Sequence, residues 1–252
     1  MNLLKNKLSI IPVVNQDVDK TSDLAYIPTK PLPVKNFSLY VVGSPGSGKT
    51  SLIMSLFLSH PTKKNPNRNK YYYKFFDVIT LISASLNTLP NSFISKIPEN
   101  QQYMHYSDEL LTSILDDLYE GDNLNSVVIL DDVIRDLSKS KILSKLYLNR
   151  RHITHNNQLE GQGSMSIITT SQKYTLLPLH HRIAQSDIIL FRTQNNSEIN
   201  RIKDELLVDL NSDQQDELLR LAWKDPYSFL YIKLNEPKVN KYYVKFDKVM
   251  FD

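Results

Sequence analysis

Residues 43–50 read Gly43-Ser44-Pro45-Gly46-Ser47-Gly48-Lys49-Thr50, which matches the pattern G-x-x-x-x-G-K-[ST]. Three of the six glycines in the chain fall within these eight residues. Glycine lets consecutive backbone N–H groups turn toward one anion, because it has no side chain to obstruct them. The pattern therefore predicts a loop that binds phosphate groups. The alternative is an ordinary Gly/Ser turn that leads into a core helix.

The flanking residues give this loop the context that phosphate binding requires. Residues 38–42 (SLYVV) predict a short buried strand, and residues 51–58 (SLIMSLFL) predict a buried helix. The N-terminus of that helix would add its dipole and unpaired donors to the loop. We expect residues 43–50 and Ser51 to bind phosphate, with Lys49 at the β- and γ-phosphates and Thr50 on Mg²⁺. ATP and Mg²⁺ are the expected cofactors.

A second motif ends in two carboxylates. Residues 126–132 (SVVILDD) predict a central buried strand with Asp131 and Asp132 at its carboxyl end, where ligands bind in open α/β sheets. Asp131 is expected to hold Mg²⁺ through water, and Asp132 to orient and activate an attacking water. The alternative is a strand followed by an acidic helix N-cap, a position that Asp favours.

The rest of the pattern predicts further strands and helices in alternation. Strands are expected at 77–83, 166–172 and 187–192, and helices at 107–118, 137–151 and, broken near Asn211, 197–223. Two β-like runs at 227–233 and 241–246 predict a C-terminal hairpin. Four prolines and no sustained periodicity in residues 1–36 suggest an N-terminal arm or cap. We expect one α/β domain over 37–252, with its core at about 37–200 and C-terminal helices and hairpin over 197–252.

Bulk composition excludes several classes of protein. The 252 residues are 41% hydrophobic and 23% charged, with a formal net charge of +3, which is ordinary for a globular protein. The absence of cysteine excludes disulfides, thiolate metal sites and a cysteine nucleophile. No apolar run approaches the roughly 18 residues of a membrane span, and Lys5 and Lys7 interrupt the N-terminal apolar residues, so we expect no membrane span and no signal peptide.

The order of the motifs resembles a known group of enzymes. One strand (77–83) falls between the two motif strands, and another (166–172) follows them and ends in Gln172. This resembles the P-loop ATPases with an added central strand and a catalytic acid. More narrowly, the chain resembles the FtsK–HerA superfamily and its virion genome-packaging ATPases of large DNA viruses and virophages. The matching segments are residues 43–50, 127–132, 149–152, 167–173, 177–178, 182 and 190–192.

This resemblance implies a fold and a function. The fold would be a three-layer α/β P-loop NTPase with a mainly parallel, RecA-like central sheet in the order 5-1-4-3-2. The function would be an ATP-driven motor, a homo-oligomeric ring of five or six subunits, that moves double-stranded DNA into a preformed capsid. Partners would be double-stranded DNA and a capsid or portal-vertex protein. The protein would be virus-encoded and found in the host cytoplasm, a viral factory or the virion, and it would not be secreted.

The resemblance also assigns roles to single residues. Gln172 matches the residue that senses the γ-phosphate, and Asp132 stands where many relatives carry a longer Glu. A neighbouring subunit would supply an arginine to stabilise charge on the transferred phosphoryl group. The candidates are Arg182, which ranks first because it lies just past the sensor strand, and Arg151, Arg150 and Arg192. The alternative for each is a surface salt bridge or a contact with DNA phosphate.

Residues 63–74 offer a candidate DNA contact. Basic residues alternate there with asparagines and a tyrosine triplet, and basic side chains pair with backbone phosphates. The expected contacts are Lys63, Lys64, Arg68 and Lys70. The alternative is a solvated loop that leads into a strand.

Other function classes remain open at this stage. A cellular or plasmid FtsK/HerA-type DNA translocase is the nearest alternative, and sequence does not separate it from a packaging motor. A small-molecule kinase would use the same loop but needs a lid with arginines. An assembly protein that binds ATP without hydrolysing it is a further alternative. A GTPase would need an N-K-x-D-type motif for guanine, which the chain lacks.

Overall fold

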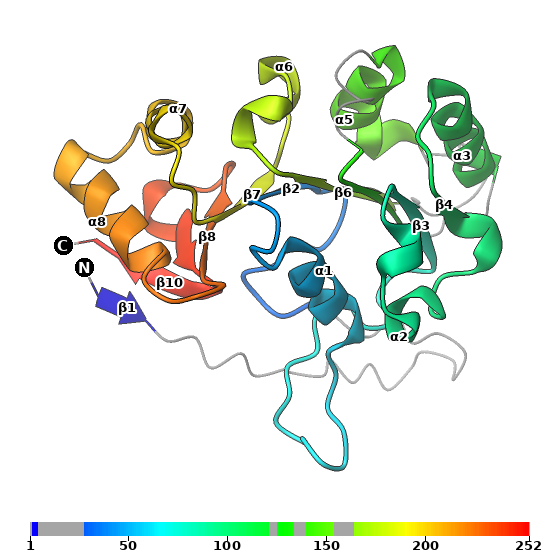
Figure 1. The fold of residues 1–252 in the computed structure, drawn as a ribbon, viewed down its shortest axis with the longest axis horizontal. Coiled ribbons are helices and arrows are strands. Elements are labelled where there is room, and N and C mark those ends of the chain that lie inside the picture. The colour runs from blue at the N-terminus through cyan, green and yellow to red at the C-terminus, as the bar shows by residue number, and fades with distance from the viewer. Residues whose placement is uncertain (1, 5–27, 121–124, 134–139, 154–163, 252) are drawn as a thin grey trace.

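The computed structural model describes residues 2–4, 28–120, 125–133, 140–153 and 164–251, except for the side chains of residues 149 and 151–153. The described strands form one mixed sheet in the order β1-β10-β9-β8-β7-β2-β6-β5-β3-β4 (Figure 1). The parallel strands are β2 (Ser38–Val42), β3 (Val78–Ser83), β4 (Gln102–Tyr103), β5 (Asn125–Asp131), β6 (Ser164–Ser171) and β7 (Asp187–Phe191). Antiparallel pairings add β8 (Phe229–Lys233), β9 (Tyr242–Val244), β10 (Asp247–Met250) and β1 (Asn2–Leu4).

This sheet confirms the expected fold class. The five strands predicted from sequence lie in the order β7-β2-β6-β5-β3, which reads 5-1-4-3-2 when they are numbered among themselves along the chain. The whole sheet differs from that five-strand expectation by its added strands at both edges. β8 and β9 form the predicted C-terminal hairpin, in which Tyr231 pairs with Tyr243.

Helices cover both faces of the sheet, so the molecule has three layers (Figure 1). The described α-helices are α1 (Lys49–Leu58), α2 (Asn91–Ile94), α3 (Asp108–Glu120), α5 (Lys141–Ile153), α6 (Leu179–Arg182), α7 (Asn196–Leu206) and α8 (Ser212–Ala222). Single 3₁₀ turns lie at Leu86–Thr88, Glu99–Gln101, Tyr174–Leu176 and Lys238–Asn240. The helical residues predicted over 197–223 divide between α7 and α8, where Asn211 caps α8 with a capping box.

Alternation along the strands produces two apolar clusters, one on each face. On β2, Leu39 and Val41 pack with Ile53 and Phe57 of α1. Tyr40 and Val42 face the other way and belong to the cluster that contains residues of α3, α5, α7 and α8. Since both faces are covered, the central strands are buried along their whole length, as expected for parallel strands.

The segment before β2 packs onto this body. Leu32 is buried in the same cluster as α1, and the Tyr72 hydroxyl donates to the carbonyl of Pro33 at 2.8 Å. The remaining residues of the predicted arm, apart from the three of β1, lie outside the described residues. In the described part of the chain, no helix is long and apolar enough to cross a bilayer.

Candidate functional site

The turn between β2 and α1 needs its glycines for two reasons, backbone conformation and lack of space for a side chain. Gly46 and Gly48 have φ values of 76° and 102°, in the left-handed region that only glycine adopts freely. A Cβ on Gly43 would lie 2.4 Å from Ser47 Oγ and 2.8 Å from Phe191 Cβ. The sequence pattern therefore encodes a backbone that side chains would not permit.

The conformation of this turn fits a phosphate group. A Cβ on Gly46 would meet nothing within 4 Å, so the loop is open at that point. Gly48 caps α1 without a side-chain hydrogen bond, which leaves the first N–H groups of the helix free to bind an anion. The buried Ser47 Oγ has no hydrogen-bond partner within the described part of the chain. Unpaired donors around an open loop are what a bound phosphate would satisfy.

Lys49 lies at the start of α1 and turns back toward the loop. Its Nζ donates to the carbonyls of Gly43 at 2.8 Å and Ser44 at 3.4 Å, and the residue is 6% exposed. The loop's own carbonyls thus hold the ammonium group beside the place where phosphate oxygens would bind. A bound phosphate would compete with these carbonyls for the Lys49 ammonium, which already lies beside the loop.

Asp131 ends β5 between two hydroxyl donors from the neighbouring strands. Its Oδ1 accepts a hydrogen bond from Thr170 Oγ1 at 2.7 Å, and its Oδ2 accepts one from Ser83 Oγ at 3.0 Å. Burial raises the pKa of the Asp131 carboxyl, although these two hydrogen bonds and the charge of Lys49 act in the opposite direction. The carboxylate is therefore fixed in orientation but costly to keep ionised in the absence of a cation.

Asp132 projects from the next position into a cavity. Its backbone has a φ of 53°, and its N–H donates to Thr170 Oγ1 at 2.9 Å. The cavity has a volume of about 710 Å³, within the usual range for ligand sites. Lys49, Thr50 and Asp132 line it together. The structure therefore brings Lys49, Thr50 and Asp132 to one place, whereas Asp131, the residue before Asp132, is not among the residues that line this cavity.

The donor set also fits a magnesium ion. In proteins Mg²⁺ usually takes one or two carboxylates and completes its shell with water and substrate phosphates. Thr50 and Asp131 would be the protein's donors here. Within the described residues no group of three or more His, Asp or Glu side chains could hold a metal ion by itself.

Gln172 follows β6 directly, next to the start of the phosphate loop. The backbone N–H of Gly43 donates to the carbonyl of Ser171 at 3.0 Å, which ties the end of β6 to the loop. The Gln172 side chain is exposed. Gln172 is not among the residues that line the cavity with Lys49, Thr50 and Asp132, so the sensor role that the resemblance implies stays a prediction.

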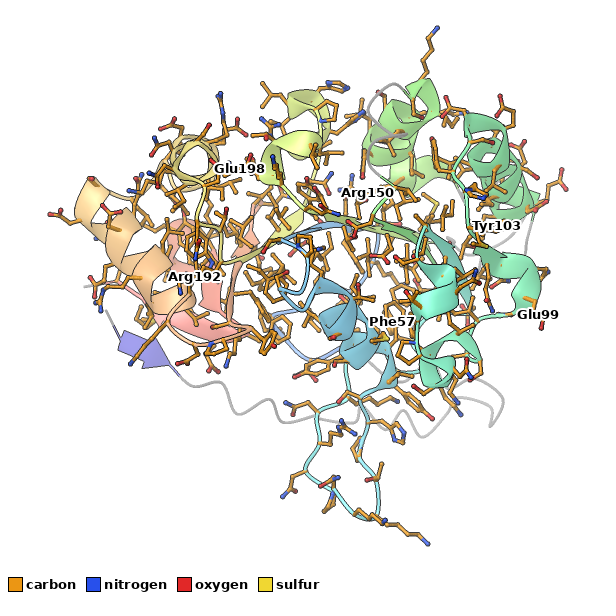
Figure 2. All side chains as sticks on the ribbon, viewed as in Figure 1. Phe57, Glu99, Tyr103, Arg150, Arg192 and Glu198 are labelled. Atoms are coloured by element: carbon orange, nitrogen blue, oxygen red, sulfur yellow. The ribbon has the colours of Figure 1, made fainter. Side chains whose placement is uncertain are left out.

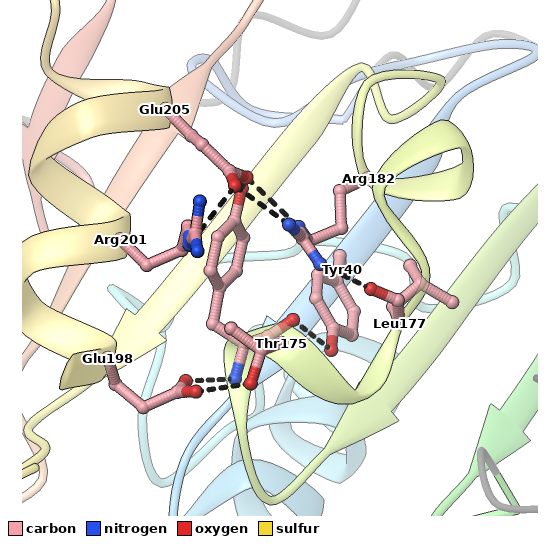
Figure 3. A network of polar contacts seen from close by, with 8 residues as sticks. Tyr40, Thr175, Leu177, Arg182, Glu198, Arg201 and Glu205 are labelled. Atoms are coloured by element: carbon pink, nitrogen blue, oxygen red, sulfur yellow. Dashed lines mark hydrogen bonds and ion pairs between the residues drawn. The ribbon is translucent and has the colours of Figure 1, made fainter.

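The structure corrects the ranking of the candidate arginines. Arg182 is buried within its own chain, where its Nη2 and Nε donate to Glu205 at 2.7 and 3.0 Å and its Nη1 donates to the Leu177 carbonyl at 2.6 Å (Figure 3). A guanidinium with these bonds is not presented to a neighbouring subunit, so Arg182 loses its first place. Arg150 is likewise buried, and its Nε donates to the Asn36 carbonyl at 2.7 Å.

The other two candidate arginines are not shown to be buried in the way that Arg182 and Arg150 are. Arg151 lies on α5, and its side chain is outside the described residues. Arg192 is exposed directly after β7, and it lies to the left of Arg150 in the view of Figure 2. It lines a second cavity of about 740 Å³, together with residues 44–47 of the phosphate loop. Arg192 therefore lies beside the loop of its own chain.

The candidate DNA contacts lie on the segment between α1 and residue 71, which projects from the body of the molecule (cyan in Figure 1). Lys63, Lys64 and Arg68 are exposed, and Lys70 is partly buried. This segment is at the C-terminal end of α1, whereas the phosphate loop is at its N-terminal end. The ten residues of α1 therefore separate the two by about 15 Å.

Sequence reasoning missed two residues of this site. Ser83 and Thr170 hold Asp131 from both sides, and Thr170 also binds the backbone of Asp132. The sequence could have indicated both residues, because both are polar and lie at the carboxyl ends of strands that flank β5. The sequence did not show that their hydroxyls would point at the same carboxylate.

No protein-family model and no curated protein matches the sequence. Solved structures do match the fold. The genome packaging NTPase B204 from Sulfolobus turreted icosahedral virus 2, in complex with sulfate, is 16% identical with a TM-score of 0.58, over 84% of this chain and 96% of that one. The DNA-packaging ATPase B204 from Sulfolobus Turreted Icosahedral Virus is 16% identical with a TM-score of 0.55, over 84% and 98%.

A third matching structure is a protein of conjugation. The pCW3 conjugation coupling protein TcpA, solved with ATPγS, is 11% identical with a TM-score of 0.50, over 85% of this chain and 60% of that one. At these identities the matches establish a shared P-loop NTPase fold. The neighbours are also consistent with the resemblance to packaging ATPases of the FtsK–HerA type.

Proposed function

We propose that this protein hydrolyses ATP and uses the energy to move double-stranded DNA, as a motor that packages a viral genome into a preformed capsid. One observation carries the proposal: Lys49, Thr50 and Asp132 line a single cavity over an open glycine loop. The more general part of this proposal is that the protein is a nucleoside triphosphatase. It is supported by the likeness in fold to B204, which has been solved with ATP-gammaS and with AMPPCP.

The chain's own residues suggest how hydrolysis would proceed. The N–H groups of the loop and the ammonium of Lys49 would bind the β- and γ-phosphates, and Thr50 and Asp131 would hold Mg²⁺, which neutralises charge on those phosphates. Asp132 would orient and activate the attacking water from the cavity wall. Gln172, next to the loop, would respond to loss of the γ-phosphate. Donors that are in place before the reaction would supply most of the acceleration.

Packaging is preferred over other uses of ATP on two grounds. B204, described as a genome packaging NTPase, is matched in fold over 96% of its own length, so the likeness spans nearly the whole of that structure. The exposed Lys63, Lys64 and Arg68 supply a projecting basic surface for DNA phosphates. We propose that a ring of five or six subunits forms, docks on a capsid or portal vertex, and works in an infected cell.

The contacts of the arginines change which of them we propose for the nucleotide site. Arg192 is exposed, and it lines a cavity beside the phosphate loop of its own chain. We propose it as an arginine that acts on the nucleotide of the same subunit. Arg151 stays the candidate for action on a neighbour.

A plasmid or cellular DNA translocase is the second candidate, and the likeness to the conjugation coupling protein TcpA favours it. Both candidates predict DNA-stimulated hydrolysis. A small-molecule kinase predicts instead phosphate transfer that DNA does not affect.

The test is ATP hydrolysis by the purified protein, with and without long double-stranded DNA, for the parent and for Lys49→Ala. We expect hydrolysis that DNA stimulates and that Lys49→Ala abolishes, because the variant lacks the ammonium that binds the phosphates. Hydrolysis that is indifferent to DNA would reject the motor and keep the nucleotide site. Equal hydrolysis by Lys49→Ala would reject the site itself.

A further inference from the structure

One aromatic residue stands at the mouth of the candidate nucleotide cavity. Tyr227 lies on the loop between α8 and β8 and is 71% exposed. A Cβ built on Gly48 would lie 3.3 Å from Tyr227 Cδ1, so the ring rests against the junction of the phosphate loop and α1. Tyr227 lines both the cavity of about 710 Å³ and the adjoining one of about 740 Å³. The ring therefore forms part of the wall of the site.

The backbone at Tyr227 is not one that tyrosine favours. Residues 225–228 form a turn in which the Ser228 N–H donates to the Asp225 carbonyl at 3.2 Å, and Tyr227 occupies its third position with a φ of 58°. Glycine or asparagine is the usual residue at a turn position with positive φ. A large side chain there is strained, and its exposure means that burial of the ring does not offset the strain. Neither the backbone conformation nor burial therefore explains a tyrosine at position 227, which points to a role for its exposed ring.

The lining of the cavity combines two chemistries. Lys49, Thr50 and Asp132 are its polar and charged residues. The same cavity is also lined by the aromatic residues Phe191, Tyr227 and Phe229. A nucleotide combines matching chemistries, because it carries charged phosphates and a flat aromatic base.

We propose that Tyr227 stacks on the base of the bound nucleotide and so forms its base subsite. This deepens the proposed function and rests on it, since the phosphates must lie on loop 43–50. An aromatic face stacks on any nucleobase, because every base has a π face. The hydroxyl of Tyr227 is not needed for stacking, so phenylalanine should replace it.

The experiment measures binding of two ligands to the full chain by calorimetry, in the presence of Mg²⁺. ATP carries a base, and inorganic tripolyphosphate carries only the phosphates. Tyr227→Gly removes the ring but suits the positive φ, so the turn and the fold are retained. We expect it to weaken ATP binding by about 5- to 100-fold and to leave tripolyphosphate binding unchanged. Tyr227→Phe should bind both ligands like the parent.

Two results would overturn the subsite. An equal loss of affinity for ATP and tripolyphosphate in Tyr227→Gly would mean that the ring only supports the loop beside Gly48. Unchanged ATP binding in that variant would mean that the base lies elsewhere. Lys49→Ala separates the proposed function from this inference: if it binds both ligands as the parent does, the phosphate site is wrong, whatever Tyr227 does. Thermal unfolding of each variant verifies that it is folded.

Discussion

At the scale of single residues, the site depends on one buried carboxylate and the hydroxyls around it. Asp131 is 4% exposed and accepts hydrogen bonds from Ser83 and Thr170, on the two strands that flank its own. A charge in this position is costly to bury, and two hydroxyl donors reduce that cost without removing it. The arrangement lowers the stability of the fold, but it keeps a carboxylate in position to bind a cation.

Asp131→Asn should therefore stabilise the protein in the absence of ligand while abolishing hydrolysis. The raised pKa of Asp131 means that its ionised form disfavours the folded state, so removal of the charge should raise the melting temperature near neutral pH. The gain should be about 2–4 °C for each kcal/mol. It should vanish below about pH 4, where an ordinary aspartate is protonated in the unfolded chain as well.

Calorimetric melting of parent and variant from about pH 3 to pH 8 checks this prediction. Mg²⁺ with ATP should stabilise the parent more than ATP alone does, and should give Asp131→Asn no such extra gain. A variant that melts lower than the parent at neutral pH would show that the carboxylate's hydrogen bonds outweigh its burial.

Thr170 makes a second residue-scale prediction. Its hydroxyl donates to the carboxylate of Asp131 and accepts from the backbone N–H of Asp132, so it fixes the Asp131 carboxylate and the Asp132 backbone at once. Thr170→Val keeps the shape of the side chain and removes this bridge. We expect kcat to fall by about tenfold or more, with ATP affinity within about twofold of the parent.

Thr169→Val is the matched control. Thr169 is the preceding residue on β6, equally buried, and its hydroxyl bonds Tyr147 on the opposite face of the sheet. That variant should lose a hydrogen bond and some stability but keep its kcat. Equal loss of kcat in the two variants would mean that Thr170 acts only through the stability of β6.

At the scale of elements, the sequence predicted the central ones well and the peripheral ones poorly. β2, β5 and β7 carry continuous apolar runs because both of their faces are buried, and such runs are visible in sequence. β4 has two residues, and β1 and β10 have three and four. Elements this short form because an existing edge offers hydrogen bonds to them, and no local pattern encodes that edge.

An ion pair joins α6 and α7 through Arg182, the residue that the sequence ranked first as the arginine for a neighbouring subunit. Arg182 of α6 binds the carboxylate of Glu205 on α7, and the Tyr174 hydroxyl donates to the same carboxylate at 2.8 Å (Figure 3). Burial would raise the pKa of Glu205, but the hydrogen bonds from Arg182 and Tyr174 outweigh it and hold the pKa below its usual value. The ionised pair therefore fastens two helices over one face of the sheet.

Arg182→Ala and Glu205→Gln should accordingly act on stability and spare catalysis. Each breaks a largely buried pair, so each should lower the free energy of unfolding by about 3 kcal/mol. Because the pKa of Glu205 is lowered, the pair stabilises the fold above the ordinary pKa of glutamate, near pH 4.3, and this contribution is lost as pH falls through the folded-state pKa.

Denaturant unfolding and kcat below the melting temperature check this assignment. Arg201→Ala is the control, because Arg201 is 56% exposed and 3.6 Å from Glu205, and an exposed pair should contribute less than about 1 kcal/mol. An Arg182→Ala variant as stable as the parent but unable to hydrolyse ATP would restore Arg182 to the neighbouring subunit's site.

At the scale of the whole molecule, the C-terminal residues extend the sheet and complete the site. β8 pairs antiparallel with β7, which lies next to the phosphate-loop strand β2. This pairing brings the loop that precedes β8, with Tyr227, beside residues 44–47, which are about 180 positions away in the chain. The sequence revealed the glycine loop and the acidic pair because each is local. It did not reveal Tyr227, because only the pairing of distant strands places it there.

The chain's polar surfaces also have a whole-molecule arrangement. The nucleotide cavity lies at the N-terminal end of α1, and the basic segment with Lys63, Lys64 and Arg68 projects beyond its C-terminal end. A change at the phosphates that shifts α1 would therefore move the basic segment as well. This gives the proposed motor a direct mechanical connection between ATP and DNA.

The most direct test of the motor is displacement of a third strand from DNA. A labelled oligonucleotide is bound as a triplex to long double-stranded DNA, and its release is followed after the protein and ATP with Mg²⁺ are added. We predict release that requires hydrolysis, so that it is absent with ATPγS and absent in Lys49→Ala, which lacks the ammonium beside the loop. ATP hydrolysis that DNA stimulates, without any release of the third strand, would contradict translocation.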